Sequence, residues 1–232
     1  MGYFVIKLYT EFVGHWQKSF EIVNSFVGRL DQTQLVGYSH NRYVGFFPIP
    51  YIAVRFNFAE DNEGKRLAEE IIDDLIERRL IVGKGEWEPF NASTSVRKAT
   101  ETSTKCAFAF KNWMDGNSEA ANFYLQNPNA KIQFMSRFLV LLLQQLDFQT
   151  HFEEYPISPQ FMNLIRACAT HCAEQVRQAL SEDLNIDFME RFIHHFLNCV
   201  HINLNEERAI HIVIQHWEWL ASLVNNRSSY KE

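Results

Sequence analysis

The stretch that decides the fold is residues 51–58, which read Tyr51-Ile52-Ala53-Val54-Arg55-Phe56-Asn57-Phe58. Large apolar side chains occupy every second position of this run, so it predicts a strand with one buried face. Residues 36–46 predict a partner strand. Pro48 and Pro50 stand between the two strands and remove two backbone donors, so this connection cannot lie inside a sheet and a hairpin is expected.

The segments around this hairpin alternate between helix and strand signals. Residues 3–9 predict a strand, residues 15–30 and 63–79 predict amphipathic helices, and residues 80–82 predict a short last strand. The resulting order, β-α-β-β-α-β, is that of a ferredoxin-like split βαβ sheet with both helices on one face. The opposite face, which carries Arg55, then needs a cover from elsewhere in the chain.

Strand signals end near residue 95, and only helical periodicity follows. The expected helices cover residues 95–114, 118–125, 131–148, 159–180, 187–200 and 205–224. We therefore expect an α+β protein. Its ferredoxin-like α+β half would span residues 1–94 and pack against an all-helical half over residues 95–232, as one compact domain.

Composition and charge exclude several classes of protein. The 232 residues carry 22 basic and 28 acidic side chains, a net charge of −6 that argues against a nucleic-acid binder. The longest apolar run, residues 138–143, is far short of the roughly 20 residues that span a bilayer. Four cysteines are too few for a disulfide scaffold, and no secretory signal is recognised. We expect a cytoplasmic protein with neither membrane nor direct nucleic-acid contacts.

Two clusters of potential ligands can be judged from their spacing. Cys168, His171 and Cys172 lack a fourth metal ligand and the paired spacing of zinc sites, so we expect no metal and burial of the thiols instead. His194, Asn198 and His201 stand at i, i+4 and i+7, on one face of a predicted helix. An asparagine beside a histidine can fix its tautomer for acid/base chemistry, and the alternative is a set of polar packing residues.

The predicted hairpin carries two cations. Arg42 and Arg55 lie on neighbouring strands, and a guanidinium binds a carboxylate through two parallel hydrogen bonds. The alternative is a pair of surface arginines on an edge strand. Glycine-rich phosphate loops, G-x-S-x-G and HExxH motifs are absent, so nucleotide, serine and metallo-hydrolysis have no support in the sequence.

The order of several short motifs resembles a known family. The motifs are Val5-Ile6-Lys7-Leu8-Tyr9, Arg42-Tyr43, Pro50-Tyr51-Ile52-Ala53-Val54-Arg55-Phe56, His194-His195-Phe196-Leu197-Asn198-Cys199 and Glu206-Glu207-Arg208. In this order they resemble the C-terminal, glutamate-eliminating domain of lantibiotic dehydratases, also found alone as the thiopeptide-type bacteriocin biosynthesis domain. The resemblance spans nearly the whole chain, although no motif is intact.

The departures from the family pattern remove cations. Tyr51 replaces the family's hairpin histidine, Ala53 replaces the first arginine of its pair, and Cys199 replaces the arginine that ends the last motif. Residues 87–91 lack the arginine and glycines usual there, while Arg55 is kept. In the family these cations are expected to hold a glutamyl ester during elimination. Their loss leaves open a related reaction, the [4+2] pyridine-forming cyclisation, which depends more on positioning.

The resemblance implies a lyase-type enzyme that matures ribosomally synthesised peptides and acts on a leader-bearing precursor peptide, by elimination at modified Ser/Thr or by that cyclisation. The implied catalytic residues are His194, Arg55 and Tyr51. The implied substrate-binding residues are Asn198, Arg42, Tyr43, His40 and Tyr38. No cofactor is implied, and the candidate partners are a separate dehydratase or synthetase subunit and a second copy of the chain.

Two other readings stay open at this point. The chain could be a non-catalytic partner that binds a peptide or a synthetase and keeps the fold without the chemistry. It could also be an α+β protein that binds a small molecule in an aromatic pocket.

Overall fold

The computed structural model describes residues 3–11, 16–30, 34–43, 49–146, 158–179 and 186–215. They form two compact units. The sheet unit consists of Met1–Thr104 and Leu184–His201, and the helical unit of Lys105–Asp183 and Ile202–Glu232. The predicted mixed class is confirmed, with an antiparallel sheet and helices in the N-terminal part and a largely helical remainder.

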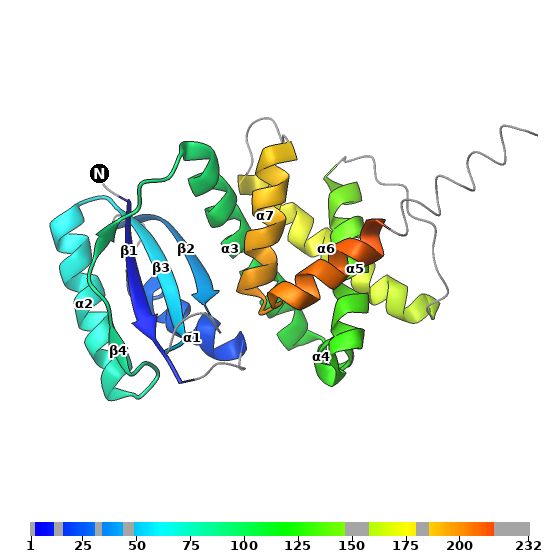
Figure 1. The fold of residues 1–232 in the computed structure, drawn as a ribbon, viewed down its shortest axis with the longest axis horizontal. Helices are drawn as coiled ribbons and strands as arrows, with labels where there is room; N and C mark the ends of the chain where they lie inside the picture. The colour runs from blue at the N-terminus through cyan, green and yellow to red at the C-terminus, as the bar shows by residue number, and fades with distance from the viewer. Residues whose placement is uncertain are drawn as a thin grey trace, which may run out of the picture. The chain divides into compact units, whose positions relative to one another are not determined.

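The sheet has five strands, and every paired neighbour is antiparallel. They are β1 (Tyr3–Tyr9), β2 (Leu35–Tyr43), β3 (Tyr51–Phe58), β4 (Gly83–Lys84) and β5 (Glu88–Pro89). Their order is β2-β3-β1-β4 (Figure 1). β5 also pairs with β1. The predicted strands at residues 3–9 and 51–58 are confirmed, and the end of the predicted 36–46 strand lies outside the described residues. The ferredoxin-like arrangement stays a prediction.

The bounds of the strand predicted at residues 80–82 are wrong, because the short strand β4 lies at Gly83–Lys84 and Leu80 and Ile81 follow the end of α2. The backbone N–H groups of Leu80 and Ile81 both donate to the carbonyl of Leu75, at 2.9 and 3.4 Å. Arg79 adopts a left-handed conformation with φ 57°, as is common where a helix ends. Strand pairing to β1 therefore begins only with the N–H of Val82, which donates to the Tyr9 carbonyl at 2.8 Å.

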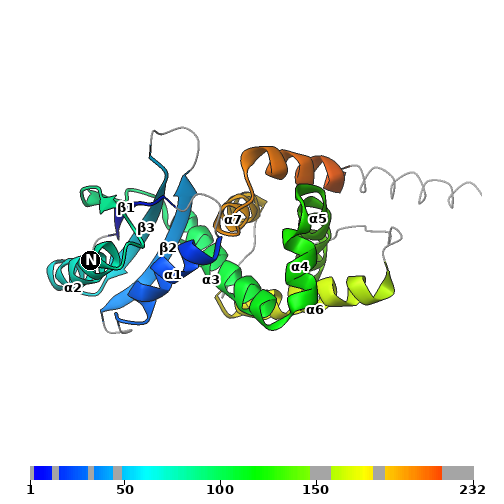
Figure 2. The ribbon, with the colours of Figure 1, turned by 90° about the horizontal axis from the view of Figure 1, so that it is seen from below.

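Helices α1 (Trp16–Val27) and α2 (Asp61–Glu77) lie on the same side of the sheet (Figure 2). The core beneath them is aromatic. The ring of Phe56 on β3 lies 5.0 Å from Phe26 on α1 and 5.3 Å from Phe58, measured between centroids, and all three are fully buried. A Cβ at Gly64 would lie 2.3 Å from the Phe58 ring, so the glycine lets α2 approach the sheet closely.

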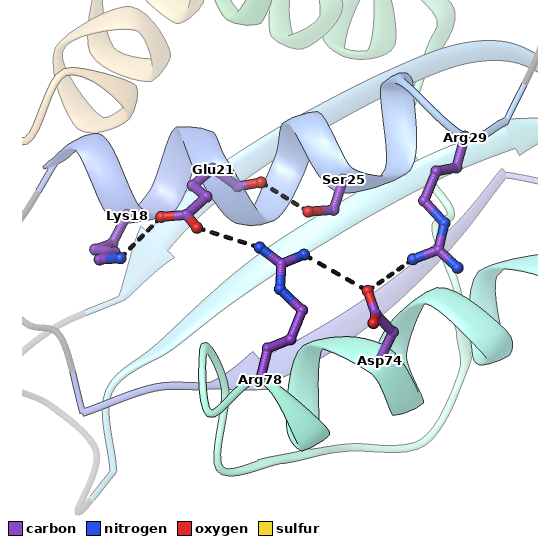
Figure 3. A network of polar contacts seen from close by, with 6 residues as sticks. All are labelled: Lys18, Glu21, Ser25, Arg29, Asp74 and Arg78. Atoms are coloured by element: carbon purple, nitrogen blue, oxygen red, sulfur yellow. Dashed lines mark hydrogen bonds and ion pairs between the residues drawn. The ribbon is translucent and has the colours of Figure 1, made fainter.

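A chain of ion pairs joins the outer surfaces of these two helices (Figure 3). Glu21 on α1 accepts from Lys18 at 2.9 Å and from Arg78 at 3.4 Å. Asp74 on α2 accepts from Arg29 at 2.7 Å and from Arg78 at 3.5 Å. All five side chains are more than a third exposed, so each pair contributes about 0–1 kcal/mol.

Helix α3 (Thr94–Gly116) begins in the sheet unit and ends in the helical unit. The helical unit also contains α4 (Ser118–Gln126), α5 (Pro128–Gln145), α6 (Pro159–Ala179) and a helical stretch over residues 204–215. Helix α5 starts three residues before its predicted start. Asn127 caps it by accepting the N–H of Ala130 at 2.9 Å, and Pro128 occupies the first turn. The predicted 205–224 helix is described only as far as residue 215.

Helix α7 (Ile186–Cys199) lies in sequence between the two segments of the helical unit but belongs to the sheet unit. Its buried stripe contains Phe188, Phe192 and Phe196, whose rings stack in succession at 6.3 and 6.2 Å. The Ser103 hydroxyl on α3 donates to the Phe192 carbonyl at 3.0 Å. This helix carries the last motif of the sequence analysis, so the motif lies next to the sheet.

Candidate functional site

The outer edge of β2 is closed by side chains from α7 and α3. The Asn198 carboxamide accepts the N–H of Arg42 at 2.7 Å and donates to its carbonyl at 3.0 Å, the two bonds that another strand would make. Two residues earlier, the Cys199 thiol donates to the carbonyl of His40 at 3.1 Å, and the Thr104 hydroxyl accepts its N–H at 3.3 Å. These contacts fix α7 on the edge of the sheet.

Arg55 is the buried cation of the sheet. It lies on β3 opposite Ser39 of β2, and only 7% of its surface is exposed. One N–H group, on Nη1, donates to Asn41 Oδ1 at 2.8 Å, and the guanidinium carbon lies 4.8 Å from the centroid of the Phe90 ring. Within the described ranges no carboxylate pairs with Arg55, and its Nε has no acceptor. The charge is therefore buried without a counter-ion in this part of the chain.

Two neutral histidines lie close to this cation. Burial, and then the charge of Arg55, lower the pKa of His40 to about 3. His195 on α7 is 4% exposed, and burial, then Arg55, then His40, hold its pKa well below the usual value. Both imidazoles are neutral at pH 7 and add no second positive charge beside Arg55.

The prediction that His194, Asn198 and His201 share one helix face is only partly correct. His194 is exposed on α7 and shares a face with Asn198, as the spacing predicts. His201 does not, because α7 ends at Cys199 and the N–H groups of Val200 and His201 close the helix on Phe196 and Asn198. His201 has a φ of 61°, and its Nε2 lies 2.7 Å from the Ser19 hydroxyl on α1. It anchors the end of α7 to α1 instead.

The remaining predicted site residues lie on strands β2 and β3. Tyr51 is 7% exposed, shares a strand face with Arg55, and meets the Tyr9 ring edge-on at 6.2 Å. Tyr38 is half-buried, and desolvation raises the pKa of its hydroxyl. Arg42 is half-buried as well. Tyr43 ends β2, and its side chain lies outside the described part of the structure.

Sequence reasoning missed a polar cluster beside Arg55. The Tyr3 hydroxyl on β1 donates to Glu101 Oε1 on α3 at 2.5 Å. Desolvation raises the pKa of Tyr3, and the charge of Glu101 raises it further, so the phenol stays protonated. His195 was missed too. His195 follows Phe188 by seven residues and Phe192 by three, so helical periodicity alone places it on the buried stripe. The family motif drew attention to His194 instead.

The three cysteines of the helical unit form no recognisable metal centre. Cys106, Cys168 and Cys172 are free and buried, and the Cys172 thiol lies 3.9 Å from the Cys106 carbonyl. Across the residues that the structure describes, no three His, Cys, Asp or Glu side chains gather closely enough to hold a metal ion. In the same residues, no helix is long and apolar enough to cross a membrane.

The sheet with α7 on its edge can be compared with known proteins. The crystal structure of the tRNA dependent lantibiotic dehydratase MibB from Microbispora sp. 107891 superposes on this chain with a TM-score of 0.56 and 10% sequence identity. The fold is similar to part of a lantibiotic dehydratase. The match covers 100% of this chain but 29% of MibB, so the chain spans less than a third of that enzyme. No family model and no curated protein matches the sequence.

Proposed function

We propose that the protein is a lyase-type enzyme of ribosomal-peptide maturation that eliminates glutamate from a glutamylated Ser or Thr of a leader-bearing precursor peptide. The observation that carries the proposal is Arg55. Burying a cation without a counter-ion costs several kcal/mol, and such a cost is typical of a site that binds an anion. The fold similarity to a lantibiotic dehydratase, and the family resemblance of the strand that carries Arg55, support the same assignment.

The proposed reaction is a β-elimination. A base removes the α-proton of the glutamylated residue, the Cα=Cβ double bond forms, and the Cβ–O bond breaks so that glutamate leaves as a carboxylate. Negative charge develops on that carboxylate, and the Arg55 guanidinium stabilises it in surroundings from which water is largely excluded. His194 is exposed on α7 and serves as the base, whereas the buried His195 is too weak a base for this role.

Two other predicted residues receive distinct roles in this proposal. Tyr51 lies four residues from Arg55 on the same strand face and supplies a hydroxyl donor where the resembling family has a histidine. The Asn198 carboxamide forms both of its hydrogen bonds with the backbone of Arg42, so in this proposal it positions α7 and does not touch the substrate. Arg42, Tyr38 and Tyr43 stay proposed contributors to peptide binding, whereas the fully buried side chain of His40 cannot touch a peptide.

The test uses the full chain and a glutamylated precursor peptide, with mass spectrometry as the readout. We expect loss of glutamate with the wild type, a decrease of at least 100-fold in rate for Arg55→Gln or His194→Ala, and no change for Arg66→Gln. Arg66 is a suitable control because it is exposed on α2 and paired with Glu63. Loss of leader with ring formation would assign the cyclisation instead. Tight peptide binding with no mass change, unaffected by His194→Ala, would reject the enzyme and favour the non-catalytic partner.

A further inference from the structure

Three of the four cysteines of the chain lie together in the helical unit and form a thiol cluster. Cys106 is on α3, and Cys168 and Cys172 are one turn apart on α6. All three side chains are fully buried, and all three thiols are free. The Cys172 sulfur lies 3.9 Å from the carbonyl oxygen of Cys106, so it reaches from α6 to the backbone of α3.

Cys172 is the central member of the thiol cluster. Burial raises the pKa of its thiol, but hydrogen bonds from Cys106 and Cys168 lower that pKa, and the net direction is down. Burial and the hydrogen bond to Cys172 both raise the pKa of Cys168. Cys172 is therefore the first of the two thiols on α6 to become a thiolate, which is the form of cysteine that reacts with oxidants.

Helix geometry decides which two thiols of the cluster can be joined. Residues four apart on a helix have Cβ atoms about 5–6 Å apart, whereas a disulfide needs a Cβ separation of about 3.5–4.5 Å. Joining Cys168 to Cys172 would therefore distort α6. Cys106 belongs to another helix and is not held to this spacing, and the Cys172 sulfur already contacts its backbone. The pair favoured for a disulfide is therefore Cys106 with Cys172.

We propose that hydrogen peroxide oxidises the thiol cluster to a disulfide between Cys106 and Cys172, which gives the helical unit a reversible, redox-sensitive cross-link. The Cys172 thiolate attacks one peroxide oxygen, the O–O bond breaks, and a sulfenic acid forms while the released hydroxide takes the proton that Cys172 lost. The Cys106 sulfur then attacks the Cys172 sulfur, and the hydroxyl group leaves with the Cys106 proton as water. Two thiols and one peroxide thus give one disulfide and two water molecules.

The cross-link closes a long loop, because Cys106 and Cys172 stand 66 positions apart in the sequence. A disulfide across a loop of this length removes conformational freedom from the unfolded chain and so stabilises the folded state. For a chain of this size we expect the midpoint of thermal unfolding to rise by roughly 5–15 °C on oxidation. A thiol reductant reverses the change by thiol–disulfide exchange.

The experiment treats the folded full chain with millimolar hydrogen peroxide and follows it by mass spectrometry and by thermal unfolding. Because the thiols are fully buried, peroxide reaches them only through local opening of the helical unit, so the treatment is continued for hours. We expect the loss of two hydrogens, a peptide link between Cys106 and Cys172, and a raised unfolding midpoint that returns to its first value with dithiothreitol.

The chain supplies its own controls for this experiment. Cys172→Ser should form no link and show no rise of the unfolding midpoint on oxidation. Cys168→Ser changes a buried thiol one turn away on the same helix and should form the link as the wild type does. Cys199 is buried in the sheet unit with its thiol on the His40 carbonyl, so it should stay reduced throughout.

Three results would overturn the inference. They are a treated wild type that keeps all its thiols free, a link between Cys168 and Cys172 within α6, and an oxidised form whose unfolding midpoint does not rise. None of these readouts uses the peptide assay. A failure here therefore leaves the proposed elimination standing, and a failure of the elimination leaves the cross-link standing.

Discussion

The Arg55→Met substitution tests whether the buried guanidinium stabilises the fold or is kept to bind a ligand. Methionine fills a similar volume without charge. The substitution loses the bond to Asn41, worth about 1.5–3 kcal/mol, and the stacking on Phe90, worth about 0.5–2 kcal/mol. Arg55 is only 7% exposed and has no counter-ion among the described residues, so the substitution also removes the cost of burying that charge, which amounts to several kcal/mol. These effects nearly cancel, so we expect the free energy of unfolding to stay within about 1 kcal/mol of the wild type or to rise.

The assay is urea unfolding at pH 7, combined with hydrogen exchange of β3 to report on the sheet unit. The control is Arg29→Met, which removes an exposed ion pair with Asp74 and should cost at most about 1 kcal/mol. A loss of 3 kcal/mol or more for Arg55→Met would refute the reasoning. A loss of that size is typical when one partner of a compensated buried pair is removed, and it would make Arg55 a structural residue.

Three further predictions concern the parts that surround the site. Asn198→Ala leaves both backbone groups of one β2 residue unpaired, so it should destabilise the protein by about 2–4 kcal/mol and speed amide exchange in β2, with exposed Asn24→Ala as a neutral control. The folded-state pKa of His40, about 3, lies below its unfolded value, so the unfolded chain binds the proton first. His40 should therefore lower the free energy of unfolding by up to about 1.4 kcal/mol per pH unit from pH 6.5 downward, and His195, whose pKa is also lowered, adds to this slope. His40→Gln should remove the share of His40 and make the slope shallower. Gly64→Ala should cost about 1–3 kcal/mol in thermal or urea unfolding because its methyl meets the Phe58 ring, whereas Gly116→Ala, with open space around it, should be neutral or stabilising.

The fold was predictable where large apolar residues alternate along the sequence. They do so in β1 and β3, whose bounds match the structure at both ends, although β3 is buried on both faces. Leu80 and Ile81 misled the prediction because they are apolar for another reason, namely to cover the end of α2. β5 has no apolar period at all, and its Pro89 is tolerated because the strand is very short and pairs only at the edge of β1.

The sequence indicates which residue types are unusual in the candidate site, but it does not indicate which residues contact one another. Arg55 stands out in the sequence as a cation in an apolar strand, and burial confirms that it is unusual. The contact between Tyr3 and Glu101 carries no spacing signal, because the two residues lie 98 positions apart in the sequence. The role of Asn198 could not be predicted either, because its bond to the backbone of β2 does not depend on which side chains that strand carries.

Cys199 explains how the chain tolerates losing a cation that the resembling family carries. Its side chain is fully buried, and burial raises its pKa to about 12, so the thiol stays protonated and donates to the His40 carbonyl. A guanidinium buried at this position would repel that of Arg55, whose charge already acts on the Cys199 thiol. The exchange of arginine for cysteine thus closes the edge of β2 and leaves Arg55 as the one buried cation described on the sheet. By the balance worked out above, a chain that kept only the fold would lose little stability by losing Arg55 as well. Its retention therefore favours an anionic ligand over a purely structural role.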